Sequence, residues 1–306
     1  MSTQAAAPQV ALPQTALEVP IPPKAASDSA ANSTSSEAAT ISRFRTRWGA
    51  DLAVHEGNPD FVLSLARGLR VIEAFDSRPE GLSIADIARA TELSRAAVRR
   101  LLITLELLGY IEATGRKYRL RHRVLHLGMS YLSSSSLAAV SQPTVQRITE
   151  ELDESSSVCV LDGDEVLCVA GAVRRGLMSL DVTTGSRLPV HCTAAGRVLL
   201  AALPEDQLQA HLERIELKAV TAKTIVSREV LARDIRRVRE QGFSVIDEEL
   251  EAGIRAIAVP IVSKQGHTAA SLGVGALASR VSLDELQTRF LPVLRDQSRA
   301  IGQFVS

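Results

Sequence analysis

The spacing of apolar and polar positions separates the chain into three stretches. Residues 1 to about 40 are rich in Ala, Pro, Ser, Thr and Gln, have few large apolar side chains and show no sustained period. Such a segment buries too little apolar surface to offset its ordering entropy. We therefore expect residues 1–57 to form a disordered N-terminal arm, followed by a compact helical block and then a longer mixed region.

Apolar residues recur at helical spacing from position 61 to 75, which predicts an amphipathic helix. Asn58 suits an N-cap, and Pro59 suits the first helical turn. Pro79 and Gly81 break the chain after this helix. The predicted inward face comprises Phe61, Leu65, Leu69, Ile72 and Phe75, widened by Val62, Leu63 and Val71.

Two short helices are predicted next, each opened by a serine. Ser83 caps the first, with Asp86 at the capping-box position, and Ser94 caps the second. Gly109 ends the second helix. Its buried side is predicted to hold Val98, Leu101, Leu102, Leu105 and Leu108, which leaves Arg95, Ala96, Arg99 and Arg100 exposed near its start.

Residues 110–113 and 117–120 read as two short strands around Thr114-Gly115-Arg116. A capped helix, a tight break, a capped basic helix and a small hairpin in this order indicate a winged helix-turn-helix over residues 58–122. The alternative is a helical core with a solvated basic face. The predicted contacts to double-stranded DNA are Ser83, Ser94, Arg95, Ala96, Arg99, Arg100, Arg116 and Lys117.

The distribution of charged residues also separates the predicted DNA-binding region from the rest, although the net charge of the whole chain is zero. Residues 61–123 contain 12 Lys and Arg against 7 Asp and Glu, so the positive charge lies where the DNA-reading pattern lies. Arg43, Arg45, Arg47 and Trp48 stand in the arm, as a solvated segment or as a basic arm touching DNA.

Residues 123–140 are predicted to form a linker helix and residues 141–306 a second domain. Helices and strands interleave there without a G-x-G-x-x-G turn or a P-loop, so no nucleotide cofactor is indicated. The predicted architecture is α+β, an antiparallel sheet with helices packed on it. Its helices are expected over 143–152, 193–203, 227–241 and much of 281–304, and its strands over 158–161, 166–170, 177–182, 243–246, 256–262 and 269–276.

Cysteine content and hydropathy narrow the cellular setting. Cys159, Cys168 and Cys192 show no C-x-x-C spacing, which argues against a zinc site or a disulfide framework. Charges interrupt every apolar run well short of the ~18 residues of a membrane span. No secretory signal opens the chain. A cytoplasmic protein without membrane contact is therefore expected.

The resemblance that joins both regions is to the IclR family of bacterial transcription regulators. The resembling segments are 64–75, 82–112 and 118–128 in the first region and 185–204, 238–261 and 271–277 in the second. The resemblance implies a winged-helix dimer, a dimerising linker helix and a GAF-like effector-binding domain, as a homodimer or homotetramer. Residues 61–75 further resemble the subgroup that controls aromatic-acid (β-ketoadipate pathway) catabolism.

The resemblance also implies a pocket for a small organic or aromatic acid. Carried onto this chain, its lining is Leu177, Leu180, Leu188, Ala194, Ala195, Asp247, Ile254, Ala256, Gly273 and Gly275. Independently, small residues after Thr193 leave helix-start N–H groups accessible, which suits a carboxylate. Gly273 and Gly275 alternate on one strand face and clear space there, which favours an aromatic ring over a very small acid.

Other charged residues of this region could either bind a ligand or simply be solvated. Arg174, Arg175 and His191 could pair with a carboxylate, or the arginines could lie in a solvated loop. Arg197 is expected to face solvent, and the acidic cluster Asp247-Glu248-Glu249-Glu251 to form a solvated turn rather than a metal site. His191-Cys192 point to opposite faces if extended, which argues against a nucleophile pair, and Cys192 is expected to be buried.

The sequence therefore predicts a ligand-responsive DNA-binding regulator rather than an enzyme. An enzyme with an accessory DNA-binding domain and a ligand-blind architectural DNA-binding protein are the rival functions. An IclR-type regulator for a different small acid is the nearer alternative.

Overall fold

The computed structural model describes residues 58–75, 80–134, 136–174 and 182–305. Contacts divide the chain into two compact units between Val124 and Leu125. The predicted arm, with its basic residues, lies outside the described residues. Within the described part, no helix is both long and apolar enough to cross a membrane.

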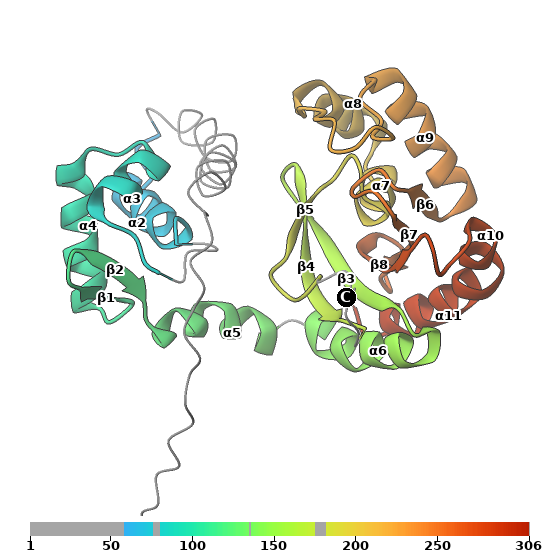
Figure 1. Cartoon of the computed structure of the whole chain (residues 1–306), viewed down its shortest axis with the longest axis horizontal. Coiled ribbons are helices and arrows are strands. Elements are labelled where there is room, and N and C mark those ends of the chain that lie inside the picture. Colours follow the sequence, from blue (N-terminus) through green and yellow to red (C-terminus); the bar gives the residue numbers. More distant parts are fainter. Residues whose placement is uncertain (1–57, 76–79, 135, 175–181, 306) are drawn as a thin grey trace, which may run out of the picture. The chain divides into compact units, whose positions relative to one another are not determined.

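The first unit has three α-helices and a two-stranded hairpin within its described residues (Figure 1). They are α2 (Leu63–Glu73), α3 (Ile84–Thr91), α4 (Arg95–Leu107), β1 (Ile111–Thr114) and β2 (Lys117–Leu120). The predicted winged helix-turn-helix order is therefore confirmed.

Hydroxyl caps begin both helices of the motif, as predicted. The Ser83 hydroxyl accepts from the Asp86 N–H while Asp86 accepts from the Ser83 N–H, a complete capping box. The Ser94 hydroxyl accepts from the Ala97 N–H at 3.2 Å. Asn58 does not cap α2, because it lies five residues before the helix begins at Leu63 and its side chain accepts from the Asp60 N–H.

The predicted inward face of α2 is only partly right. Phe75 is buried, but Leu65 and Leu69 are 61% and 46% exposed, and Leu108 after α4 is also exposed. Helix α2 is apolar on more than one side, so the pattern left two packing faces open. Packing turns Val71, Ala74 and Phe75 into the core of this unit. The same core holds Leu82, Ile87, Val98, Leu102, Leu105 and Ile111.

The wing is a tight hairpin. Thr114 pairs with Lys117, so Gly115 and Arg116 form the turn, with Gly115 at φ +63°. Leu82 exchanges two backbone hydrogen bonds with Tyr118, which fastens the hairpin to the segment before α3. Gly81 also has positive φ, and a Cβ there would lie 2.5 Å from the Tyr118 oxygen, so this approach requires glycine.

The second unit contains a six-stranded sheet in which every neighbouring pair is antiparallel, as predicted. Its order is β5-β4-β3-β8-β7-β6. The strands are β3 (Ser155–Asp162), β4 (Glu165–Ala172), β5 (Arg187–Pro189), β6 (Ser244–Asp247), β7 (Ile254–Val262) and β8 (Thr268–Leu277). Strand β5 was not predicted. Of the strand expected over 177–182, only residue 182 belongs to the described part of the chain.

Helices cover both faces of this sheet. They are α6 (Ser136–Leu152), α7 (Ala194–Ala201), α8 (Glu205–Arg214), α9 (Arg228–Gln241), α10 (Leu283–Glu285), the π-helical turn η2 (Leu286–Phe290) and α11 (Leu291–Gly302). The short helix η1 (His122–Val124) and helix α5 (Leu125–Ser134) precede them in the chain. Helix α8 was missed in the sequence, because Pro204 was interpreted as an end rather than as the position before a new helix.

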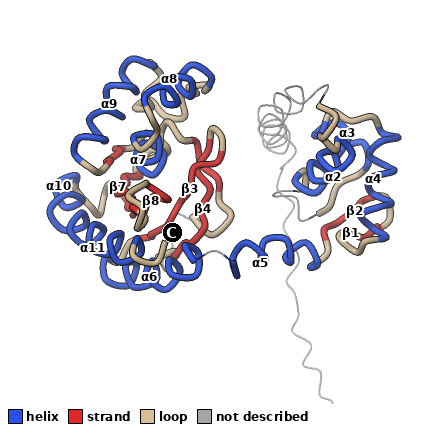
Figure 2. Tube along the Cα trace, turned by 180° about the vertical axis from the view of Figure 1, so that it is seen from behind, coloured by secondary structure: helices blue, strands red, loops and turns tan. Residues whose placement is uncertain are grey.

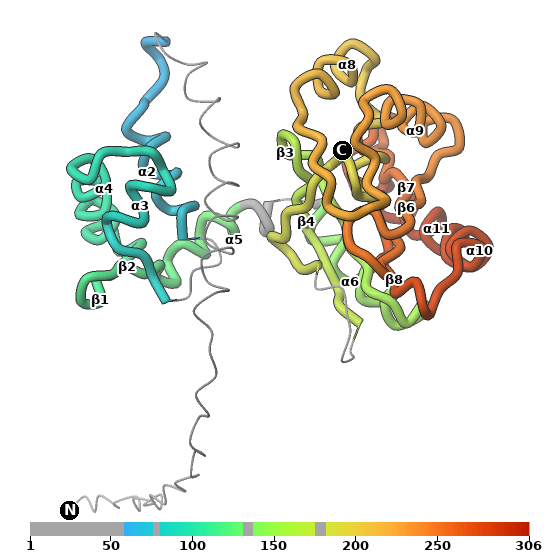
Figure 3. The backbone as a smooth tube through the Cα atoms, turned by 45° about the horizontal axis from the view of Figure 1, so that its top comes forward, coloured from blue at the N-terminus to red at the C-terminus, as the bar shows by residue number. Residues whose placement is uncertain are grey.

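The two faces carry separate cores. Figures 1 and 2 show α6 and α11 along one face and α7, α8 and α9 toward the other, and Figure 3 shows the same layers from a tilted view. The α6-side core includes Val145, Ile148, Val158, Ile257, Leu272, Phe290 and Leu294. The α7-side core includes Cys159, Cys168, Val190, Val198, Leu200, Leu231, Ile235 and Ile246.

Helix α6 begins seven residues before the predicted start at Pro143. Leu137 lies in the α6-side core, and Ala138 is also buried. This burial stabilises the helical turns before Pro143. The Gln142 amide also exchanges two hydrogen bonds with the Gly171 backbone. The predicted linker over 123–140 thus contains part of a helix that packs in the second unit.

Candidate functional site

The start of α4 presents a basic surface to solvent. Arg95, Ala96, Arg99 and Arg100 are all exposed, because Val98 and Leu102 turn the opposite side of the helix into the core. Among the described residues, none of these three arginines forms an ion pair. Unpaired guanidinium groups on the first turns of a capped helix can donate to base edges and phosphates in a major groove.

The wing adds charge beside this surface. Arg116 stands exposed at the turn, and Lys117 follows it on β2. Lys117 Nζ lies 3.7 Å from the Glu80 carboxylate, but both side chains are largely exposed, so the pair is weak and can yield to phosphate. Ser83 and Ser94, predicted as DNA contacts, use their hydroxyls as helix caps.

In the second unit, sheet register brings the two predicted glycines next to small residues. Gly273 lies between Ser157 and Ala258, and Gly275 lies between Ser155 and Ala256. Cross-strand neighbours share a face, and Ala258 belongs to the α7-side core. These two rows therefore form a surface of small side chains facing α7.

Helix α7 starts against this surface. The Thr193 hydroxyl accepts from the Gly196 N–H and donates to the Pro189 carbonyl. Within the described part of the chain, the N–H groups of Ala194 and Ala195 have no hydrogen bond. A Cβ on Gly196 would lie 2.1 Å from the Val190 oxygen, so the close approach of this turn requires glycine.

Most of the predicted pocket residues gather here. Ala194 belongs to the α7-side core, and the half-buried Leu188, Ala195 and Ala256 pack against it. Ile254 lies two residues before Ala256 and so on the same side of β7. Leu177 and Leu180 lie outside the described residues.

Asp247 does not join this group. It pairs in register with Arg255, whose Nε donates to it at 2.6 Å, and Lys223 Nζ donates at 2.7 Å. These bonds, with Arg255 first, hold the pKa of Asp247 below its ordinary value. Its strand neighbour Ile246 faces α7, so the Asp247 side chain projects from the opposite face of the sheet.

Arg197 is buried, and its predicted solvent exposure is wrong. Its side chain is 1% exposed, and it forms ion pairs with both Glu249 and Asp234, the latter at 2.9 Å. Its Nε donates to the His191 carbonyl at 3.2 Å. Glu249 is buried with it, so the acidic cluster is not simply a solvated turn. Two carboxylates distant in sequence made burial of this guanidinium possible.

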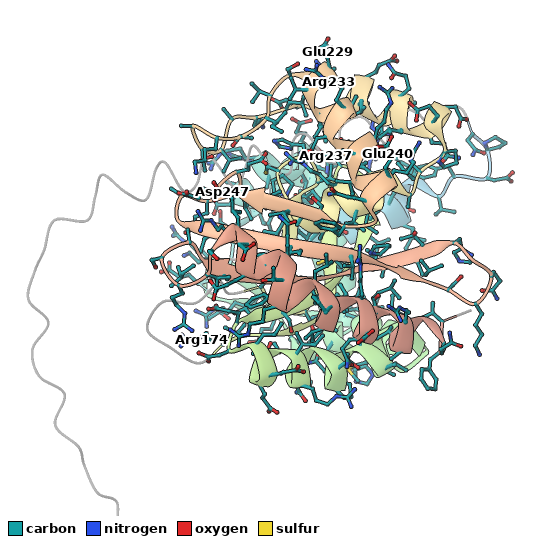
Figure 4. The ribbon with its side chains drawn as sticks, turned by 90° about the vertical axis from the view of Figure 1, so that its right-hand side faces the viewer. Arg174, Glu229, Arg233, Arg237, Glu240 and Asp247 are labelled. Atoms are coloured by element: carbon teal, nitrogen blue, oxygen red, sulfur yellow. The ribbon has the colours of Figure 1, made fainter. Side chains whose placement is uncertain are left out.

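The other predicted charges are also engaged. Arg174 is paired with Asp153, with Nε 3.1 Å from a carboxylate oxygen, so it already has a carboxylate partner within the chain. Figure 4 shows Arg174 and Asp247 well apart, so their charges do not converge on one ligand. His191 Nε2 bonds the Lys218 carbonyl at 3.0 Å, and burial lowers its pKa.

Cys192 is buried, as predicted, and burial raises the pKa of its thiol to about 12. A protonated thiol beside a neutral, bonded His191 is not an activated nucleophile. Arg175 lies outside the described residues.

The polar residues of β3 that lie next to the two glycines were not identified from the sequence. Ser155 and Ser157 flank the glycine rows, and the Ser155 hydroxyl accepts from the Arg174 N–H. A run of three serines resembles a loop in the sequence. Only strand register places alternate members of this run on the α7 side.

A separate cleft of about 400 Å³ lies at the β6 edge of the sheet, away from the glycine rows. Arg237 lines it from α9, on whose outer side Figure 4 also shows Glu229, Arg233 and Glu240. Opposite charges around this cleft pair with each other, as Lys223 does with Asp247 and Arg237 with Asp234.

These two units define a class of protein: a winged-helix DNA-binding unit joined to an α+β unit of the kind that binds small ligands. Residues 64–115 match the IclR helix-turn-helix domain, and residues 129–303 match the C-terminal domain of the bacterial transcriptional regulator IclR. The chain belongs to the IclR family of bacterial transcriptional regulators.

The chain is also similar to individual members of this family. The Pca regulon regulatory protein of Pseudomonas putida is 48% identical over 244 residues, which cover 79% of this chain and 84% of that protein. The p-hydroxybenzoate hydroxylase transcriptional activator of Acinetobacter baylyi is 34% identical, with 80% and 93% covered. An IclR homolog from Microbacterium hydrocarbonoxydans, crystallised with 4-hydroxybenzoate, has a TM-score of 0.67 at 26% identity, with 78% and 97% covered.

Proposed function

We propose that this regulator controls genes for aromatic-acid catabolism and responds to an aromatic carboxylic acid such as 4-hydroxybenzoate or protocatechuate. The observation that carries the DNA-binding part is the group of exposed, unpaired arginines at the start of α4: Arg95, Arg99 and Arg100. Ala96 beside them is small enough to contact a thymine methyl. Arg116 and Lys117 would hold the flanking phosphates.

The proposed ligand site lies between α7 and the small-residue rows of the sheet. The carboxylate would accept from the N–H groups of Ala194 and Ala195, where the helix dipole favours negative charge. The ring would lie on Ala256, Gly273 and Gly275, against Leu188. The relatives named for Pca and p-hydroxybenzoate regulation, and the homolog bound to 4-hydroxybenzoate, support this class of ligand.

A thermal-shift screen of the purified chain tests the ligand. Protocatechuate, 4-hydroxybenzoate, β-ketoadipate, muconate, pyruvate and glyoxylate would be compared. Dose-dependent stabilisation by an aromatic acid is expected, since ligands that bind only the folded state raise Tm. Stabilisation by pyruvate or glyoxylate alone would instead assign a different small acid.

Replacing Gly275 with Leu would fill the proposed ring site and should abolish the stabilisation. Asp247→Asn is the matched control, because Asp247 projects from the other face and should leave the ligand response unchanged.

We also propose that the regulator acts as a dimer. Val62 just before α2 is 60% exposed, Leu65 and Leu69 on α2 are 61% and 46% exposed, and Leu107 on α4 is 84% exposed. Apolar side chains gathered on a surface in this way indicate a protein contact. Helix α5 likewise exposes Leu125, Leu127 and Met129. Sedimentation of wild type and Leu65→Glu tests this, with dissociation expected for the variant.

Within this proposal, regulation rather than catalysis is the function of the second unit. The engaged His191 and the protonated Cys192 support that interpretation. Turnover of any aromatic acid by the purified chain would contradict it.

A further inference from the structure

Two thiols face each other across neighbouring strands of the sheet. Cys159 on β3 is the register partner of Cys168 on β4. Directly opposed residues of antiparallel strands have Cα atoms roughly 4.5–5.5 Å apart. That separation lies within the roughly 4.4–6.8 Å that a disulfide spans. Both residues belong to the α7-side core, so both side chains project to the same side of the sheet.

The two thiols have different hydrogen-bond partners. The Cys168 thiol donates to the Ala170 carbonyl at 3.1 Å, and the Ser157 hydroxyl lies 3.7 Å from the Cys159 sulfur. The contact with the Cys168 thiol, together with Ser157, holds the pKa of Cys159 below its ordinary value against the effect of burial. The same contact raises the pKa of Cys168. The Cys168 proton is held by the Ala170 carbonyl, so Cys159 is taken as the nucleophile, and its thiolate is the reactive form.

Strand geometry gives the pair room to close. The register between β3 and β4 shifts at Val158/Cys159, which leaves Val169 as an extra residue on β4. A bulge interrupts the ladder locally and lets the strand bend. The sulfurs can therefore approach by local movement of β4.

We propose that Cys159 and Cys168 form an oxidisable dithiol, which hydrogen peroxide closes into a disulfide across β3 and β4. The Cys159 thiolate attacks one peroxide oxygen; the O–O bond breaks, and a sulfenic acid and hydroxide form. The Cys168 sulfur then attacks the Cys159 sulfur, the S–O bond breaks and water leaves. Two thiols are oxidised and one peroxide is reduced to two waters.

Access runs through the proposed ligand site, and this step rests on the proposed function. Cys159 and Ser157 project from the same side of β3, and Ser157 is the cross-strand neighbour of Gly273. Ser157 is half-buried, whereas both cysteines are only 2% exposed. A small oxidant reaching the glycine rows thus meets Cys159, and a bound aromatic acid should protect it.

The test is peroxide treatment of the folded, full-length chain, followed by alkylation under denaturing conditions and mass spectrometry. The reduced chain has three free cysteines to alkylate. The oxidised chain should lose two of these sites and two hydrogen atoms. Trypsin leaves both cysteines on one peptide, residues 148–174, but cleavage before Asp162 separates them. The two fragments should then stay joined until reduced.

Cys192→Ala is the matched control, since it removes a buried thiol outside the pair and should leave the cross-link intact. Cys159→Ala and Cys168→Ala should each abolish it. The wild-type result alone decides the proposal if a variant fails to fold. Persistence of three free thiols, oxidation to a sulfinic acid without a cross-link, or a bond to Cys192 would each overturn it.

Protection is measured with 4-hydroxybenzoate at ten times its Kd. Only about one tenth of the chain is then free, so oxidation should slow about ten-fold. Binding without protection would overturn the access route. Absence of binding in a separate titration would overturn the proposed ligand while leaving the cross-link result standing.

Discussion

Helix α4 of the first unit and helix α7 of the second begin alike. A hydroxyl, Ser94 or Thr193, caps each helix, and arginine follows within the first two turns. Yet Arg99 on α4 is exposed and unpaired among the described residues, whereas Arg197 on α7 is 1% exposed and bonded to two carboxylates. The capping chemistry is the same in both helices, but the surroundings of the arginines differ.

The difference shows how one residue type serves two purposes. On α4, the arginines keep their charge available because no carboxylate of the described residues pairs with them. On α7, Glu249 and Asp234 arrive from the β6–β7 turn and from α9, so the guanidinium ties three segments together. An arginine near a capped helix start is thus a ligand-binding group only when the tertiary structure leaves it exposed.

The largest effect is expected from Arg197→Ala. Removing the guanidinium leaves Glu249 and Asp234 buried without their partner, which should cost about 3–5 kcal/mol of unfolding free energy. Urea unfolding of the full chain measures it. Arg237→Ala, which removes an exposed partner of the same Asp234, is the control and should cost less than about 1 kcal/mol. Equal costs would contradict the comparison.

Arg99→Ala and Arg100→Ala should leave stability unchanged and weaken DNA binding. A lost base contact costs about 1–3 kcal/mol, which is about 5- to 150-fold in Kd. The operator would be selected from randomised duplexes and the affinity measured by fluorescence anisotropy at moderate salt. Arg236→Ala on α9 makes the same charge change outside the DNA-binding unit and should have no effect. Unchanged specific binding by both α4 variants would remove the proposed reading role.

The two caps provide a finer comparison. Ser94→Ala should cost about 1 kcal/mol, the usual value of an N-cap hydroxyl. Thr193→Ala should cost more, because this buried hydroxyl also donates to Pro189. Thr193→Ser keeps both hydrogen bonds and serves as the control in chemical denaturation. A larger loss for Ser94→Ala would reverse the order predicted from burial.

The smallest effect is expected from pH. Burial first lowers the pKa of His191, with the positive Arg197 also lowering it, while the Lys218 carbonyl and Glu249 raise it. A histidine with a depressed folded-state pKa favours unfolding when it takes up a proton. Its contribution to stability is therefore present above the unfolded pKa near 6.5 and lost as pH falls below it.

His191→Gln should flatten this part of the stability profile between pH 7 and 5. His211 is the comparison, since burial lowers its pKa as well and should produce a similar residual slope. A profile that is unchanged in the His191→Gln variant would show that another group carries the pH dependence.

Much of the fold could be predicted from local chemistry. Capping serines and the Gly115 turn placed the helices and wing of the first unit, since these signals act within four residues of themselves. Most strands of the second unit were also predicted from the sequence. The inward face of α2 could not be predicted, because its apolar residues surround the helix and only the contact with α3 and α4 selects a side.

The candidate site divides in the same way. The exposed arginines of α4 followed from position on a short amphipathic helix. The environments of Asp247, Arg197 and Cys159 did not, because each depends on a partner on another element, found only through sheet register or helix packing.

The sequence by itself determined the order of elements, the two-part organisation and the charge at the start of α4, because propensity, capping and periodicity are properties of neighbouring residues. Only the tertiary structure decided which charges are neutralised, which small residues share a face and which thiols meet. Those outcomes depend on contacts between residues tens of positions apart, and a single sequence carries no direct measure of such contacts.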